Sequence, residues 1–316
     1  MAKYTSIGGS ALIEGVMMQG NGKMGIAVRR ANGEIVLKTE KLTAPKGFIF
    51  KIPIVRGVIN FIRSMIISYK ALMYSADVSL EEVTGEDEGE ISEGFGKFLS
   101  IIAMILGVVL GVGIFMYLPT LLADLLNKVL PMGPYVKRIV VGVIKMLIFM
   151  GYMLAVSQMK DMRRVFEYHG AEHKTIFCYE AKGELTPQNA KSFRRFHPRC
   201  GTSFIVITLI VSIFASMFIP WKTALLHSVL KIAFLPVIMG VAYEFIKLAG
   251  KYDNAFTRII SAPGLWFQKI TTKEPDEKQL EIAIWALKCV LEDYPLDTRL
   301  VVKEDGTVEQ ETEKND

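Results

Sequence analysis

The chain has 316 residues, 51% of them hydrophobic, and a mean hydropathy of +0.33, which is more apolar than an ordinary soluble domain of this length. Its net charge of +5 is too modest to favour a nucleic-acid-binding protein. Its three cysteines all fall in segments expected to face the reducing cytosol, which argues against a disulfide-stabilised fold. We therefore expect a mainly α, polytopic membrane protein.

The first 55 residues are expected to form a small cytosolic unit that contains a β-hairpin. Partly alternating, β-branched runs at 25–30 and 34–40 flank Asn32-Gly33, a pair typical of hairpin turns. The glycine-rich stretch from Gly8 to Gly20 lacks the spacing of a phosphate-binding loop. That stretch predicts tight turns and close backbone packing.

Residues 56–77 and 78–97 predict an interfacial or re-entrant helix followed by an acidic linker. Arg63 and Lys70 make a free-standing span unfavourable, since a charge at the centre of a span costs about 2.5–3.5 kcal/mol. The second segment is rich in Glu and Gly, a composition typical of a flexible spacer.

Residues 98–250 are expected to form a membrane domain of about four helical spans. The apolar runs cover 98–126, 139–159, 203–220 and 224–248, close to the 20 residues that a hydrocarbon layer of ~30 Å requires. Lys and Arg crowd the connection at 160–202, whereas the link between the third and fourth runs holds only Lys222. The positive-inside rule then places loop 160–202 and both termini in the cytosol. The first residues do not resemble a signal peptide, and the expected location is the bacterial cytoplasmic membrane.

The C-terminal part predicts interfacial and amphipathic helices over 251–300 and a disordered acidic tail over 301–316. Trp266 and Phe267 near basic residues suit the headgroup level of a bilayer. An apolar stripe at helical spacing over 276–292 predicts a helix packed on the cytosolic domain.

Three of the four histidines lie in loop 160–202. On a helix, His169 and His173 share a face, with Glu172 at its edge, so both imidazoles can bind one cation. The order His-x-x-Glu-His is the inverted zincin pattern, in which the histidines bind zinc and the Glu is the general base. Gly170 disfavours a helix here by about 1 kcal/mol relative to Ala.

His197 and Cys200 form a second candidate pair of ligands, three residues apart in the turn before the third span. Both pairs are anchored at the same membrane depth, so little loop entropy opposes their meeting. Glu244, near the same end of the fourth span, is a candidate carboxylate ligand. Its alternative role is an ion pair with Lys247 or Lys251.

These residues predict a divalent-metal site, with zinc as the expected ion, and leave its role open. An open site would serve a hydrolase of a peptide or lipid-linked substrate near the membrane, with Glu172 as the catalytic base. A closed site would only brace a non-enzymatic assembly or scaffold factor, whose basic surface would meet lipid headgroups, membrane proteins or ribosomal RNA. Asp124, Lys145 and Lys231 leave a third alternative, an oligomeric transporter or channel.

Motifs along nearly the whole chain resemble those of the YqhQ-like family of bacterial multi-pass membrane proteins, whose function is undefined. They are Gly9–Gly20, Arg56–Asn60, Tyr74–Asp77, His169–Lys174, His197–Ser203 and the run from Glu274 to Ile284. Gln19 departs from the pattern, where a basic residue is expected, and no proposed ligand depends on it. The resemblance implies a membrane location and the label of a predicted metal-dependent enzyme, a label that draws on the same His, Glu and Cys residues. It implies no substrate.

Overall fold

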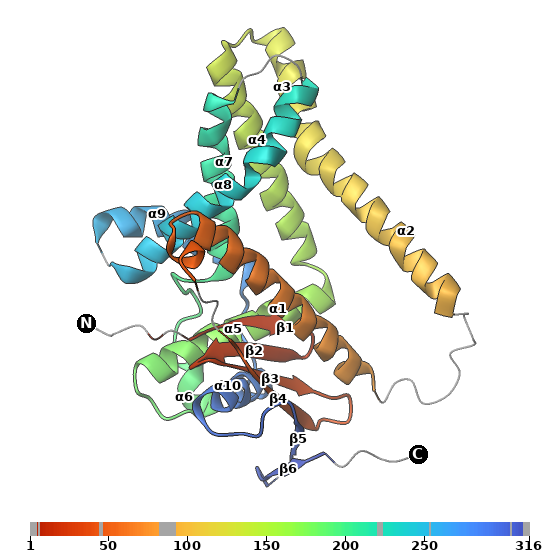
Figure 1. Ribbon diagram of the computed structural model, residues 1–316, viewed down its shortest axis with the longest axis vertical. Coiled ribbons are helices and arrows are strands. Elements are labelled where there is room, and N and C mark those ends of the chain that lie inside the picture. The colour runs from red at the N-terminus through yellow and green to blue at the C-terminus, as the bar shows by residue number, and fades with distance from the viewer. Residues whose placement is uncertain are drawn as a thin grey trace.

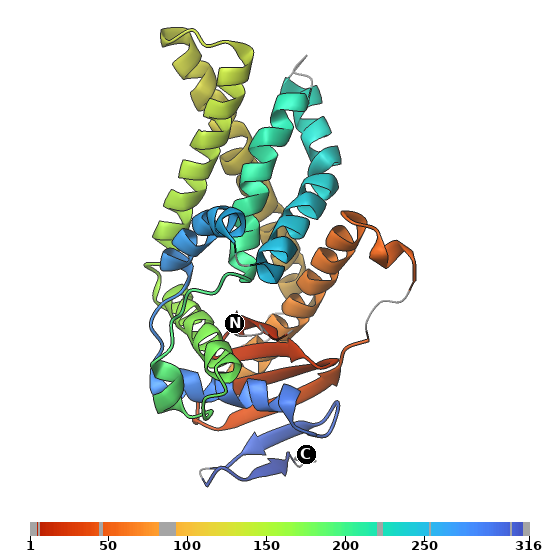
Figure 2. The same ribbon diagram turned by 90° about the vertical axis from the view of Figure 1, so that its left-hand side faces the viewer.

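The computed structural model describes residues 5, 7–43, 47–81, 93–219, 224–252, 254–303 and 305–311, without the side chains of 93–101, 224–229, 231, 250 and 251. The chain is mainly helical, with a bundle of apolar helices above an antiparallel sheet and its packed helices (Figures 1 and 2). The expected acidic linker lies mostly at 82–92, outside the described residues, as does the side chain of Lys231.

The sheet is an antiparallel meander in which the six described strands pair in chain order. The expected hairpin is present, because Arg29 pairs with Ile35 across a turn in which Gly33 has a φ of +95°. The sheet is larger than predicted, since the glycine-rich stretch supplies two further strands. The strands are β1 (Gly8–Leu12), β2 (Gly15–Gly20), β3 (Lys23–Arg29), β4 (Ile35–Lys41), β5 (Arg299–Val302) and β6 (Val308–Gln310).

The sequence predicts a disordered tail over 301–316, but the structure has two strands there. Strand β5 crosses the start of this segment, and β6 lies within it. Leu300 and Val302 are buried in the main core, and β5 pairs with β4. The neighbouring polar residues in the sequence resemble a solvated tail in composition. The backbone of β5 finds its partners in β4 on one side and in β6 on the other.

A chain that ends at Asp297 should therefore be less stable than the full chain. It loses two buried aliphatic side chains, each worth about 1.5–3 kcal/mol, and it exposes the edge of β4. We expect a lower Tm in detergent by circular dichroism. A chain that ends at Glu311 keeps both strands and should melt like the full chain, whereas equal Tm values for all three would show that β5 contributes nothing.

Strand β2 is buried on both faces, which explains its continuous apolar run. Val16 and Met18 belong to the core formed with α5 (Lys160–Glu180) and α10 (Glu277–Leu291). Met17 belongs to the opposite core, formed with α1 (Val55–Leu80). The sheet is thus covered by α5 and α10 on one side and by α1 on the other.

Helix α10 begins with a capping box between Asp276 and Gln279. The sequence predicts a single apolar stripe, but Ile282, Ala283 and Cys289 are also buried. The burial extends around the helix because α10 packs on the sheet and also against α5 and α6.

Helix α1 covers the segment expected to be an interfacial or re-entrant helix. Its second half packs on the sheet through Ala71 and Val78. Its first half crosses α8 (Ala224–Lys251), where a Cβ on Gly57 would lie 3.0 Å from the Cα of Gly240. Its location at a membrane surface stays a prediction.

Four helical segments among the described residues are long and apolar enough to cross a membrane: Ile102–Val129, Pro134–Val156, Gly201–Phe218 and Ile232–Ala249. The first comprises the end of α2 (Glu93–Val112), a π-helical turn η2 (Gly113–Tyr117) and α3 (Leu118–Val129). Pro119 lacks an N–H and its ring crowds the preceding turn, which accounts for the wider turn. The others are α4 (Pro134–Val156), α7 (Gly201–Phe218) and part of α8.

Short and surface-lying helices complete the fold and position the candidate site. They are η1 (Ile49–Lys51), α6 (Pro187–Lys191) and α9 (Ala255–Thr271). The side chain of Thr186 caps α6. Helix α9 crosses the start of α7 so closely that a Cβ on Gly264 would lie 2.5 Å from the Cβ of Ser203.

Candidate metal centre

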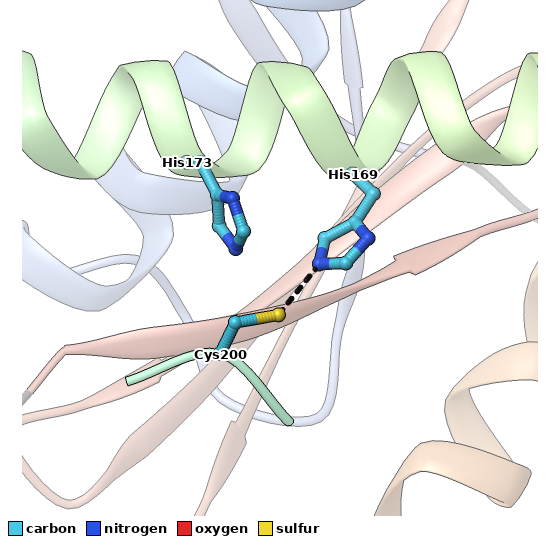
Figure 3. A group of neighbouring side chains, drawn as sticks. All are labelled: His169, His173 and Cys200. Carbon is cyan, nitrogen blue, oxygen red and sulfur yellow. Dashed lines mark hydrogen bonds between the residues drawn. The ribbon is translucent and has the colours of Figure 1, made fainter. Parts of the chain in front are cut away.

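His169 and His173 project from one face of α5 toward Cys200, which stands in the turn before α7 (Figure 3). The three candidate ligand atoms all lie within 4.8 Å of one another, and all three residues are buried. Two segments that lie about thirty residues apart in the chain thus meet at one point.

Backbone carbonyls orient both imidazoles of this His-His-Cys cluster. The Nδ1 of His169 lies 2.8 Å from the carbonyl oxygen of Thr271, and the Nδ1 of His173 contacts that of Arg195. A carbonyl can only accept, so both Nδ1 atoms carry the proton and both Nε2 atoms keep a lone pair. This is the orientation that metal-binding histidines usually have.

Cys200 approaches these lone pairs from the N-terminus of α7, where it is the N-cap residue. Its Sγ lies 3.0 Å from the Nε2 of His169, to which the thiol donates in the absence of an ion. The backbone N–H of Thr202 donates to the same sulfur at 3.4 Å. A helix N-terminus suits an anionic atom, and a thiolate is the form in which Cys binds a metal.

His197 lies beside the cluster, with its ring centroid 5.4 Å from that of His173. Burial lowers its pKa to about 2, and the positive charges of Arg199 and Arg194 add to the effect, so the ring is neutral. Its Nδ1 accepts the backbone N–H of Arg199 at 3.3 Å, which leaves the proton on Nε2. That buried N–H has no partner among the described residues. In this tautomer His197 is a hydrogen-bond donor. It lies outside the group of three ligand atoms, and its role as a ligand stays a prediction.

Glu172 lies next to the cluster, 4% exposed, with a carboxylate oxygen 4.0 Å from the Nε2 of His169. Burial raises its pKa to about 7, although the backbone N–H of Gly9 acts in the opposite direction. The carboxyl group is therefore poised to exchange a proton near neutral pH.

A cavity of about 540 Å³ opens onto the cluster. It is lined by His169, Glu172, His173, His197 and Cys200 and by five consecutive residues that lead into and form β1, Ile7–Ala11. The site thus joins three candidate ligands, a carboxyl group and an unpaired N–H donor around one space.

Comparison with known proteins identifies the family. The profile of a family described as "Protein of unknown function (DUF1385)" matches residues 52–293. This chain belongs to the DUF1385 family. It is also similar to "Uncharacterized protein YqhQ" of Bacillus subtilis (strain 168), with 33% identity over 286 residues, 88% of this chain and 89% of that protein. No solved structure matches. The resemblance seen in the motifs is confirmed, and neither name assigns a metal or a reaction.

Glu244 of this DUF1385 protein is not part of the cluster. Its carboxylate accepts two hydrogen bonds from the guanidinium of Arg56, one of them at 2.7 Å, and faces the backbone N–H of Ile54. The close crossing of α1 and α8 brings Arg56 to this position. The alternative prediction for Glu244 is an ion pair with Lys247 or Lys251. Glu244 does form an ion pair, but its partner is Arg56, from a distant segment of the chain.

Two supporting groups of the cluster were not anticipated from the sequence. The Gln268 side chain on α9 accepts the backbone N–H of His197 at 2.7 Å and donates to its carbonyl oxygen at 2.8 Å. Gly9 on β1 brings its backbone against Glu172, where a Cβ would lie 3.0 Å from the Glu172 Cγ. The sequence gives one weak signal for Gln268, a polar residue among apolar ones on an amphipathic helix, and none for Gly9.

Proposed function

We propose that this protein is a metal-dependent hydrolase that binds zinc through His169, His173 and Cys200. The observation that carries the proposal is the convergence of two imidazole lone pairs and one sulfur beside a cavity. Around tetrahedral zinc a nitrogen and a sulfur ligand lie about 3.6 Å apart, so small side-chain rotations suffice from separations of 3.0 to 4.8 Å. Three protein ligands leave one position open, as in catalytic zinc sites.

Each remaining polar group of the cavity has a chemical role in this proposal. The metal supplies Lewis acidity to a carbonyl group. Glu172 accepts a proton from the attacking water and returns it to the leaving group, a task that suits a carboxyl group of near-neutral pKa. The Nε2–H of His197 donates to the oxygen on which negative charge develops.

The cavity wall favours a peptide as the substrate. Strand β1 is an edge of the sheet, and the residues Ile7–Ala11 line the cavity beside Glu172. An extended polypeptide can pair with such an edge as an additional strand, which would carry its backbone past the metal. Gly8 and Gly9 have no side chains to obstruct this approach.

We further propose that the sheet domain faces the cytosol from the cytoplasmic membrane of a bacterium, with both termini inside. Helix α5 begins directly after the span that ends at Val156, and its first turns contain Lys160, Arg163 and Arg164. Basic residues beside the end of a span favour the cytosolic side.

Metal analysis of the detergent-purified protein tests the proposed centre. We expect about one zinc ion per wild-type chain and almost none in a His169→Ala, His173→Ala double variant. A His227→Ala variant removes the one histidine outside loop 160–202 and should keep the ion. Wild-type protein that takes up no stoichiometric zinc, when supplied with it during purification, would disprove the proposal.

A further inference from the structure

A second cavity, of about 590 Å³, lies outside the metal centre and shares none of its lining residues. It is bounded by the segment Arg194–Pro198, the end of α8 and one side of α9. Nothing in the proposed hydrolysis uses it.

The lining of this cavity is cationic. Arg194, Arg258 and Lys269 border it, and no Asp or Glu is among the described residues that do so. Thr257 and Ser261 lie along the same wall. Guanidinium and ammonium groups around a pocket of this kind select an anion, and Arg in particular matches the geometry of a phosphate.

The position of the cavity indicates where that anion comes from. Ala249, another lining residue, is the last residue of the apolar span Ile232–Ala249. Trp266 and Tyr252 border the cavity and are 63% and 47% exposed, and Ile259 on α9 is 72% exposed. Figure 1 shows α9 beside the base of α7 and α8, pointing sideways from the bundle. Aromatic, basic and exposed apolar side chains at the end of a span are typical of the headgroup level of a bilayer.

We propose that this cavity binds the phosphate group of an anionic phospholipid. The cations contact the phosphate, while Trp266 and Leu265 lie along the glycerol and the first carbons of the acyl chains. Arg195, whose carbonyl orients His173, stands between two lining residues of this cavity, Arg194 and Phe196, so one short segment joins the lipid site to the metal centre.

Native mass spectrometry of the full chain in detergent, titrated with dioctanoyl phosphatidylglycerol, tests this proposal. We expect one tightly bound copy, and about thirtyfold weaker binding in an Arg258→Gln, Lys269→Gln double variant, because each cation near the surface contributes about a factor of five. The matched control is Lys160→Gln, Arg163→Gln, which removes two cations from the first turn of α5 and should bind like the wild type. Dioctanoyl phosphatidylcholine should bind far more weakly, and millimolar inorganic phosphate should not displace the lipid.

Equal binding by the cavity variant and the control variant would overturn the proposal. Displacement by inorganic phosphate alone would also overturn it, in favour of a soluble anion. If the double variant does not fold, the single Lys269→Gln change at an exposed side chain should still weaken binding about fivefold, and Arg258→Lys should retain it.

Discussion

Glu172→Gln is expected to abolish hydrolysis while the protein keeps its zinc. The amide has the size of the carboxyl group and its oxygen can still face the backbone N–H of Gly9, but it cannot accept a proton. Loss of a general base lowers the rate by a factor of about 10²–10⁴. Since Glu172 is not one of the three proposed ligands, the metal content should not change.

The measurement uses zinc-loaded protein in nanodiscs and a mixture of fluorescence-quenched peptides, with zinc quantified in the same samples. Glu167→Gln is the matched control, because Glu167 lies on the same helix and contacts Arg163 and Gln279 away from the cluster. An active Glu172→Gln variant would contradict the assigned base. An inactive variant without zinc would show that Glu172 supports the metal instead. Wild-type protein that holds zinc but cleaves no peptide would favour the scaffold alternative.

Gly170→Ala is expected to destabilise the protein and to weaken its metal site, although alanine is the better helix former. A Cβ at this position would lie 2.0 Å from the carbonyl oxygen of Lys273. That segment cannot easily move away, because the Lys273 N–H donates to the Phe166 carbonyl at 2.8 Å. Overpacking of this kind costs about 1–3 kcal/mol, more than the ~1 kcal/mol gained in helix propensity.

The metal site should weaken in the same variant, since Thr271, which orients His169, lies two residues before Lys273. We expect a lower Tm together with a lower zinc affinity in a chelator competition. Gly111→Ala is the control, because a Cβ there meets nothing within 4 Å and should leave both quantities unchanged. A wild-type Tm for Gly170→Ala would show that this close approach does not constrain the fold.

The features predicted correctly from the sequence are those with a local cause. Four apolar runs give four membrane-length helices, because span length depends on hydropathy alone. His169 and His173 share a face because their spacing matches one helical turn. Gly170 disfavours a helix at that turn. Only the close approach of the Lys273 backbone, which leaves no room for a Cβ, explains why a glycine stands there.

The sequence by itself thus determined the membrane helices, the shared face of the two histidines and the chemistry available in loop 160–202. The tertiary structure decided which of the candidate groups meet. It brings Cys200 to the histidines, pairs Glu244 with Arg56, and places the proton of His197 on Nε2, because the Nδ1 accepts the N–H of Arg199. It also adds β5 to the sheet. Periodicity and capping act over a few residues, whereas these contacts depend on how distant helices cross and on which backbone groups are left to be paired.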